Sequence, residues 1–229
     1  MEQPSFLSGG TKESGASGWK RTSYLVVILC VVAVVATVGS LSPGGSDGPT
    51  LEESNVLYSD DFSDDRNGWM ENAGTAAYID GELHLINDNP GRSTPLWFYT
   101  PEEFDNIAFE VDATKVAGPD QQYGLIFGTE NEDFFLFGLA ENGLYCFTRW
   151  TGSDWFYIVD YVFSPHIKQG GAANTLSVAR RDQGLEFYVN GEYLRTVNWR
   201  SDIMESIGLF VGTEGMHVSF DNVKVFELQ

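Results

Sequence analysis

The sequence predicts an all-β fold, a two-sheet antiparallel β-sandwich of the jelly-roll kind, preceded by one transmembrane helix. The 229 residues include 16 Phe, 10 Tyr and 6 Trp, which is ample aromatic material for a large core. One long apolar run lies near the N-terminus, and the rest of the chain consists of short apolar runs broken by turn signals. After residue 41 no segment repeats its apolar residues at helical spacing, so further helices are not expected.

The apolar run near the N-terminus predicts a transmembrane helix over residues 22–41. Residues 22–46 carry no charge, and the run is long enough to cross a ~30 Å hydrocarbon core as a helix. Lys20 and Arg21 precede the run and acidic residues follow it, so the positive-inside rule places residues 1–21 in the cytoplasm. The alternative is a cleaved signal peptide, which the long leader and the length of the run disfavour. Both interpretations place the C-terminal domain outside the cell membrane.

Two segments beside this helix are expected to lack regular structure. Residues 1–21 and 42–55 are rich in Gly, Ser and Pro and show no periodicity, which is typical of a disordered tail and a flexible tether. The folded domain is then expected over residues 56–229.

Three dipeptides predict β-hairpins within that domain. Asp80-Gly81, Asn142-Gly143 and Asn190-Gly191 each separate two short apolar runs, and type I′ turns need positive φ at both central residues. Further strands are expected at 107–114, 123–128, 155–162, 175–181, 206–212 and 217–228. About thirteen strands in ~170 residues indicate two packed sheets. No repeat of fixed period is visible, which disfavours a propeller or a solenoid.

The charge of the chain limits its partners. The net charge is −20, and nucleic acid is excluded because phosphate binding needs a basic surface. Residues 42–229 contain 10 Lys and Arg against 31 Asp and Glu, a net −21 outside the membrane. The negative charge of this domain disfavours binding to anionic polymers, so a neutral glycan or a cell-surface protein is the expected partner. The two cysteines, Cys30 and Cys146, form neither a disulfide framework nor a zinc motif.

The order of the apolar blocks resembles a known family. DDFSDDRNGW at 60–69 followed by AYIDGELHL at 77–85 resembles the start of concanavalin A-like lectin/glucanase (laminin G-like) jelly-roll domains of exported, membrane-anchored bacterial proteins. The resemblance covers residues 57–228 and continues through the blocks at 109–128, 134–139, 170–194 and 207–227. It implies the fold. Members of this family include glycan-binding modules, adhesion domains and some glycosidases, so the fold alone does not imply one of these functions.

Glu110 and Asp112 are the candidate catalytic residues. Residues two apart in a strand share a face and lie ~6.6–6.8 Å apart, a spacing that suits two carboxylates across a glycosidic bond. The stretch also resembles the E-x-D-x-(x)-E strand of family-16 glucanases, and this resemblance implies a nucleophile, a supporting Asp and an acid/base Glu. Thr114 or Lys115 stands where the acid/base carboxylate belongs, so we expect no catalysis from this strand alone.

Two alternatives remain open for this strand. A hydrolase would need a third carboxylate from another segment, such as Glu130, Glu132 or Asp133. Otherwise the segment is an ordinary strand with a solvated polar face, and Phe109 and Val111 pack inward.

Tyr145, Arg149, Trp155 and Tyr157 are the candidate ligand-binding residues. Alternation places the first two on one face of one strand and the last two on one face of the next. If the two faces coincide, three rings and a cation form one surface on which sugars stack. The alternative is that these rings fill the core, as aromatic residues of a sandwich usually do.

Asp61 and Asp221 are the candidate metal ligands. Asp61 lies at the expected first strand and Asp221 in the expected last one, and these strands are often neighbours in jelly rolls. Hard oxygen ligands suit Ca²⁺, so we expect a structural calcium ion there and no other cofactor. Chance clustering in an acidic chain is the alternative.

These observations predict a single-pass membrane protein with a cytoplasmic N-terminus and a non-catalytic domain outside that recognises a carbohydrate or another cell-surface ligand. A glycoside hydrolase and a structural or protein-interaction domain are the two alternatives.

Overall fold

The computed structural model describes residues 48–64, 67, 69, 76–99, 105–129, 133–182, 184–198 and 206–229. The expected tail, the expected transmembrane helix at 22–41 and the first part of the expected tether lie outside these residues. Within the described ranges, no helix combines the length and apolar character that crossing a bilayer requires.

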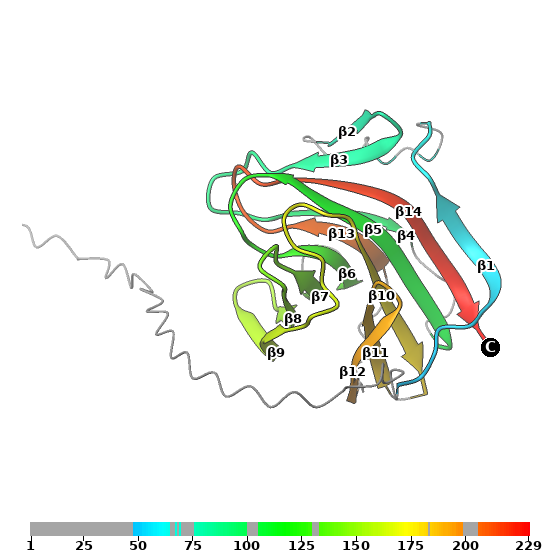
Figure 1. Cartoon of the computed structure of the whole chain (residues 1–229). Coiled ribbons are helices and arrows are strands. Elements are labelled where there is room, and N and C mark those ends of the chain that lie inside the picture. The colour runs from blue at the N-terminus through cyan, green and yellow to red at the C-terminus, as the bar shows by residue number, and fades with distance from the viewer. Residues whose placement is uncertain are drawn as a thin grey trace, which may run out of the picture. The chain divides into compact units, whose positions relative to one another are not determined.

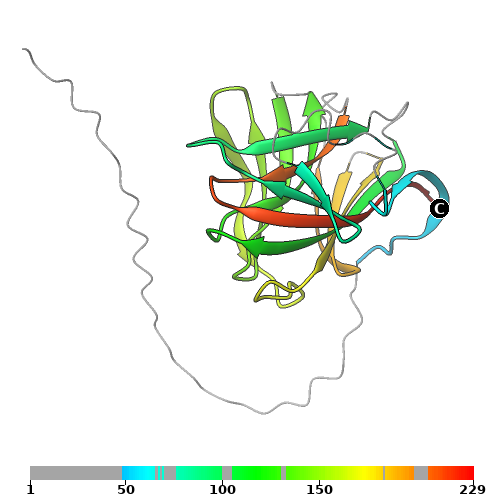
Figure 2. The same ribbon diagram turned by 90° about the horizontal axis from the view of Figure 1, so that it is seen from above.

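The described residues form strands, connected by turns and loops, in two antiparallel sheets (Figures 1 and 2). The strands are β1 (Glu53–Asp60), β2 (Ala76–Ile79), β3 (Glu82–Ile86), β4 (Thr94–Tyr99), β5 (Ile107–Ala117), β6 (Tyr123–Thr129), β7 (Asp133–Leu139), β8 (Leu144–Trp150), β9 (Trp155–Phe163), β10 (Asn174–Arg181), β11 (Gly184–Val189), β12 (Glu192–Asn198), β13 (Ser206–Val211) and β14 (His217–Leu228). The all-β sandwich that the sequence predicts is therefore confirmed.

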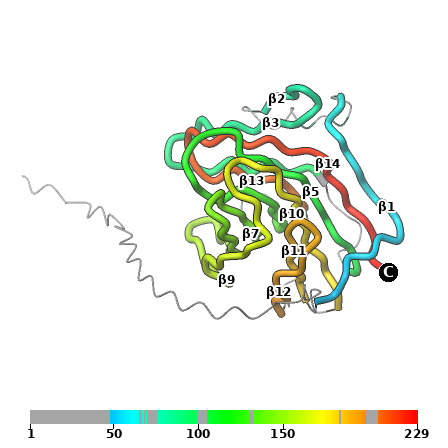
Figure 3. Tube along the Cα trace, viewed as in Figure 1, coloured from blue at the N-terminus to red at the C-terminus, as the bar shows by residue number. Residues whose placement is uncertain are grey.

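The two sheets differ in size. The eight-stranded sheet has the order β12-β11-β10-β5-β14-β3-β2, and β1 also pairs with β14. Because β3 pairs with the first part of β14 and β1 with the last part, β1 and β3 follow one another along the same side of that strand. The six-stranded sheet has the order β4-β13-β6-β7-β8-β9, so β9 is an edge strand. In Figure 3, β1 and β9 lie at opposite sides of the domain.

Two of the three expected type I′ turns are confirmed. Asp80-Gly81 and Asn190-Gly191 have positive φ at both residues and join β2 to β3 and β11 to β12. Between β7 and β8 only Gly143 has positive φ, because the connection spans residues 140–143 and closes through hydrogen bonds between Ala140 and Leu144 and between Gly143 and Ala140. That hairpin forms as expected, with a longer turn.

The main core lies between the sheets and is strongly aromatic. Alternate residues of β5 point into it, and Phe109 meets Phe127 of the other sheet at 5.4 Å between ring centroids. Phe147 of β8 packs against Phe187 of β11 at 4.7 Å. Burial of each such ring stabilises the folded state by ~1.5–3 kcal/mol, because its apolar surface is removed from water. These contacts therefore hold the two sheets together.

One strand was not expected from the sequence, and another begins earlier than expected. β4 contains Pro95, which usually argues against a strand, but β4 is an edge strand where a missing N–H is tolerated. β1 begins at Glu53, inside the segment whose composition predicts a tether.

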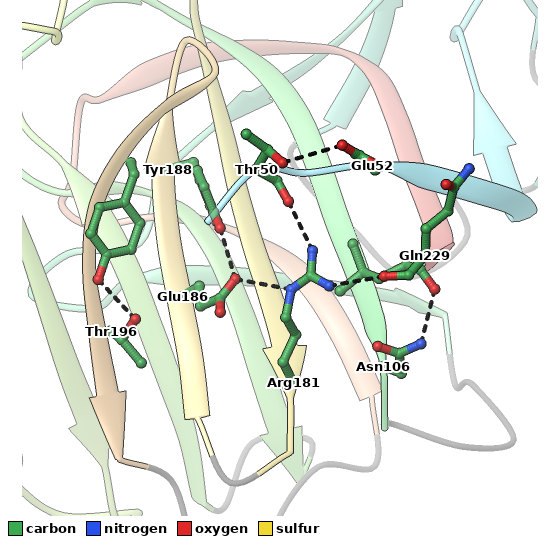
Figure 4. A network of polar contacts seen from close by, with 10 residues as sticks. Thr50, Glu52, Asn106, Arg181, Glu186, Tyr188, Thr196 and Gln229 are labelled. Atoms are coloured by element: carbon green, nitrogen blue, oxygen red, sulfur yellow. Dashed lines mark hydrogen bonds and ion pairs between the residues drawn. The ribbon is translucent and has the colours of Figure 1, made fainter. Parts of the chain in front are cut away.

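Arg181 joins residues near the start and at the end of the described domain to the eight-stranded sheet (Figure 4). Its guanidinium donates to the Thr50 carbonyl at 2.9 Å, to the Gln229 carbonyl at 3.3 Å and to the Glu186 carboxylate at 3.2 Å. The Tyr188 hydroxyl donates to the same carboxylate at 2.7 Å. The segment before β1 is therefore held by the domain.

Candidate functional site

The outer face of the six-stranded sheet is lined with aromatic side chains. Along β7, Phe135 and Phe137 point into the main core, so Phe134 and Leu136 point outward. They form a second buried cluster with Ile126 and Phe210, against which Trp97 and Trp150 pack. The sheet thus presents rings on both of its faces.

Trp155 packs against this outer cluster and is 37% exposed. Its ring centroid lies 5.3 Å from that of Trp150, 5.7 Å from Phe134 and 5.8 Å from Phe210. Edge-to-face and tilted contacts of this kind hold an aromatic ring in a fixed orientation. The exposed part of Trp155 is therefore a rigid surface.

Two irregularities in β9 bring further tyrosines to the same face. Tyr157 lies opposite Thr148, whereas Val159 lies opposite the core residue Phe147, which requires one extra residue in β9. A second register shift follows before Val162, and it is a bulge of the kind that re-aims side chains. Tyr161 consequently lies beside Tyr157, with ring centroids 5.8 Å apart.

Two adjoining hollows lie on this face. The Tyr157 hollow has a volume of about 310 Å³ and the Trp150 hollow about 520 Å³. They share Gly91, Arg92, Ser93 and Trp155. The Tyr157 hollow is also lined by Gln121, Gln122, Leu136, Thr148, Tyr157, Tyr161, Phe210, Gly212 and Thr213. The Trp150 hollow is also lined by Pro95, Phe134, Trp150 and Gly152.

The polar groups of the Tyr157 hollow are mostly neutral. Thr148 is 1% exposed, and its hydroxyl oxygen has no hydrogen-bond partner among the described residues. The Gln122 side chain donates to the Tyr161 hydroxyl. Burial, with smaller effects from Cys146 and Tyr157, raises the pKa of Tyr161, so its phenol stays protonated at neutral pH. The Trp97 indole N–H of the neighbouring cluster is also buried and unpartnered among the described residues.

Arg92 is the one charged residue among the described residues that line the two hollows. No Asp or Glu is among those lining residues, so they offer no carboxylate pair for general acid–base chemistry. The arrangement can bind a ligand through ring stacking and neutral hydrogen bonds.

The structure does not bring Tyr145 and Arg149 onto one surface with Trp155 and Tyr157. Tyr145 is 4% exposed and belongs to the main core, where burial raises its pKa. Arg149 also lies on the inner side, with its guanidinium carbon 5.4 Å from the Phe135 ring and its Nε 2.7 Å from an Asp133 carboxylate oxygen. The hairpin pairs Trp155 with Trp150 instead of Arg149, so the faces expected to coincide are opposite ones.

Glu110 and Asp112 share one face of β5, and that face is the outer side of the eight-stranded sheet. Ser177 donates to Glu110 at 2.7 Å, and Thr175 and Asn222 donate to Asp112 at 2.5 and 2.9 Å. Phe109 and Val111 pack into the core, as the ordinary-strand interpretation expects.

The third carboxylate required by a hydrolase is not found beside this pair among the described residues. Asp133 belongs to the other sheet, where Arg149 pairs with it. Glu130 and Glu132 lie outside the described residues.

Asp61 directly follows β1, and Asp221 lies in β14. These two strands are neighbours, as expected, since β1 pairs with β14 and Asp60 lies opposite Val223. Burial, together with the nearby carboxylates of Glu82, Asp112 and Asp61, raises the pKa of Asp221. The Asp61 carboxylate accepts hydrogen bonds from the Ser63 hydroxyl and backbone N–H at 2.7 and 3.1 Å, which lower its pKa.

Calcium fits this place only in part. Negative charge is concentrated there, but the described residues contain no group of three or more His, Cys, Asp or Glu side chains arranged to hold a metal ion. Backbone carbonyls would have to complete a coordination shell.

No family model and no curated protein sequence matches the chain. Among solved structures it is similar to the carbohydrate-binding module CBM66 from Bacillus subtilis, with a TM-score of 0.55 and 16% identity over 67% of this chain and 92% of that one. A galectin-like protein of unknown function from Bacillus subtilis has a TM-score of 0.55 and 15% identity, over 77% and 98% of the two chains.

A third similar structure is the catalytic domain of an endo-1,3-β-glucanase (laminarinase) from Thermotoga petrophila. Its TM-score is 0.54 and its identity 11%, over 78% of this chain and 100% of that one. At such identities the likeness shows the fold alone. The described domain therefore shares the β-sandwich fold of these structures, which is consistent with the concanavalin A-like jelly-roll class.

Proposed function

We propose that this domain binds a glycan on the outer face of the six-stranded sheet and does not cleave it. The observation that carries the proposal is Trp155, a partly exposed ring fixed by three other rings at the boundary of two hollows. Sugars place their apolar C–H faces on rings of this kind while neighbouring polar groups orient their hydroxyls. Carbohydrate-binding and glycan-acting proteins among the similar structures support the same ligand class.

The lining residues favour a neutral glycan, free or on a cell-surface protein. The neutral donors and acceptors of the Tyr157 hollow suit sugar hydroxyls, and the domain as a whole is strongly acidic. Binding without hydrolysis is supported by the lining residues, because no Asp or Glu is among the described residues that line the two hollows.

A glycan array probed with the purified full chain tests this proposal. We expect binding to at least one neutral glycan, weakened by ~1–2 kcal/mol in Trp155→Ala and in Tyr157→Ala. Phe156→Ala is the matched control, because Phe156 lies between these two residues on β9, is 55% exposed and lines neither hollow. Equal losses in all three variants, or no glycan bound at all, would remove this function.

Exposed apolar residues favour a protein-interaction role as the second candidate. Phe156, Ile158 and Phe163 are exposed on the edge strand β9, and edge strands with apolar side chains pair readily with other chains. In that case Phe156→Ala would abolish self-association measured by light scattering, whereas Tyr157→Ala would not.

We further propose that residues 22–41 anchor the domain in the cell membrane with residues 1–21 inside. The support is the uncharged run and the basic residues before it. Protease added to intact cells should release the domain and leave residues 1–20 protected. A protected domain would reverse this orientation.

A structural calcium ion near Asp61 and Asp221 is a separate proposal. It is supported by the carboxylates that raise the pKa of Asp221 and by the pairing of β1 with β14. The melting experiment that tests it is given in the Discussion.

A further inference from the structure

We infer that the ligand is a linear oligosaccharide that lies across Trp155, with one sugar unit in the Tyr157 hollow and an adjacent unit in the Trp150 hollow. This inference rests on the proposed function, and it adds the length of the ligand and the role of each hollow.

The shared wall of the two hollows carries the first step. Trp155 and the segment Gly91–Ser93 line both of them, so the hollows are adjacent and have one ridge in common. The Trp155 ring forms this ridge, and contacts with Phe134, Trp150 and Phe210 hold it in place. Each hollow has a volume typical of small-ligand sites. A ligand that occupied both would have to pass over the Trp155 ring, which a chain of linked sugars does by stacking on it.

The Tyr157 hollow has the chemistry of an anchoring subsite. The Thr148 hydroxyl is buried among its lining residues and has no partner among the described residues. A buried hydroxyl without a partner is costly, and a ligand hydroxyl that pairs with it removes that cost. Tyr157 and Tyr161 add ring surface beside it. This hollow therefore selects a hydroxyl-bearing ring and fixes its orientation.

The Trp150 hollow has a different chemistry. Pro95, Phe134, Trp150 and Gly152 line the part that it does not share. Phe134 is buried, so the half-buried Trp150 and Pro95 offer the stacking surface, and the Trp150 indole N–H is the one side-chain hydrogen-bonding group among these four residues. It is suited to a further sugar unit of an oligosaccharide whose adjacent unit is anchored in the Tyr157 hollow. Binding energy from this hollow should appear only when the ligand is long enough to reach it.

Arg92 lies at the junction. The Asn87 side chain donates to the Arg92 carbonyl at 2.7 Å, which holds this segment in place, and the guanidinium has no ion-pair partner among the described residues. Its donors are thus available to oxygen atoms of either sugar unit.

Calorimetry with oligosaccharide series tests the inference on the full chain. The probes are β-1,3-glucose, β-1,4-glucose, β-1,4-xylose and β-1,4-galactose oligomers of one to six units. We expect at least one series in which affinity rises tenfold or more between one unit and the length that fills both hollows, and then levels off. Trp150→Ala should remove this rise, so that in the variant the longest oligomer binds no more than about twofold more tightly than the single unit. Thr148→Val, which keeps the side-chain shape, should weaken every length by the same factor of about five to ten.

The outcomes separate the two proposals. Binding that does not tighten with length would overturn the two-unit ligand and leave the glycan-binding function intact, whereas no binding in any series or on the array would remove both. A length dependence that persists in a folded Trp150→Ala variant would overturn the role of that hollow. If this variant does not fold, saturation-transfer NMR on the unsubstituted protein decides, because protons of two adjacent units must receive saturation from the protein.

Discussion

The outer faces of the two sheets are built by the same alternation of side chains but differ in chemistry. On the eight-stranded sheet, carboxylates face outward and have partners: Glu110 accepts from Ser177, and Asp112 accepts from Thr175. On the six-stranded sheet, Trp155 and Tyr157 face outward around a buried Thr148 hydroxyl that has no partner among the described residues.

The difference supports the face proposed to bind a ligand. Buried polar groups in folded proteins nearly always have partners, so an unsatisfied hydroxyl beneath exposed rings requires an explanation, and a ligand supplies one. Paired carboxylates on a solvated strand need none, because water and neighbouring side chains already satisfy them. Charge alone would have drawn attention to the opposite face from the one proposed here.

The largest expected effect separates the inner from the outer tyrosines of the six-stranded sheet. Tyr145→Ala removes a ring from the main core and should lower stability by ~3–5 kcal/mol. For a domain of this size that corresponds to a fall of ~6–20 °C in the melting temperature. Tyr157 is 50% exposed, so Tyr157→Ala should cost less than ~1 kcal/mol.

Thermal melts of the two variants measure this contrast without a ligand. A Tyr157→Ala variant as unstable as Tyr145→Ala would show that Tyr157 supports the core. The glycan-binding surface would then lose one of its rings.

The sequence predicted the sandwich because its signals are local. Turn dipeptides such as Asp80-Gly81 and Asn190-Gly191 fix the positions of hairpins, and alternation along β5 identifies the core residues Phe109 and Val111. Each of these inferences needs only a few neighbouring residues.

The proposed binding face could not be predicted in the same way, because it depends on register between strands. Tyr145 and Trp155 lie in neighbouring strands, and the loop between β8 and β9 decides whether odd or even residues share a face. The bulges in β9 then bring Tyr161 to the outer face, against simple alternation with Val159. Neither Thr148 nor Arg92 belongs to a sequence motif that would have marked it as a candidate binding residue. The run of aromatic residues in β9 was the one signal that pointed to this region.

The second expected effect concerns the calcium ion proposed near Asp61 and Asp221. An ion that binds only the folded state stabilises it by ~2.7 kcal/mol at a hundredfold excess over its dissociation constant. Saturating Ca²⁺ should therefore raise the melting temperature by ~5–11 °C over EDTA at constant ionic strength. Mg²⁺ should do much less, because it requires tighter octahedral geometry.

Asp221→Asn is the control variant for calcium. Because the folded pKa of Asp221 is raised, its ionised form destabilises the fold at neutral pH, and this penalty disappears as the pH falls through the folded pKa. In EDTA at pH 7 the variant should thus melt no lower than the unsubstituted protein, and it should not respond to Ca²⁺. Equal melting temperatures in Ca²⁺ and EDTA would exclude the ion, and a normal response in the variant would place the ion elsewhere.

The smallest expected effect is that of Glu110 and Asp112 on ligand binding. Both face outward from the eight-stranded sheet, whereas the hollows lie on the outer face of the other sheet, so Glu110→Gln and Asp112→Asn should change glycan affinity by less than about threefold. Each carboxamide keeps an oxygen that accepts from Ser177 or Thr175, and the loss of charge-assisted strength should lower stability by no more than ~0.5–1.5 kcal/mol. Calorimetry with the glycan found on the array measures the affinity of these variants, and chromogenic glycosides measure their hydrolytic activity.

Because Glu110 and Asp112 lack an acid/base partner among the described residues, we expect no turnover by the unsubstituted chain. Hydrolysis that Glu110→Gln abolishes would move the active face to the eight-stranded sheet and reverse the contrast between the two faces.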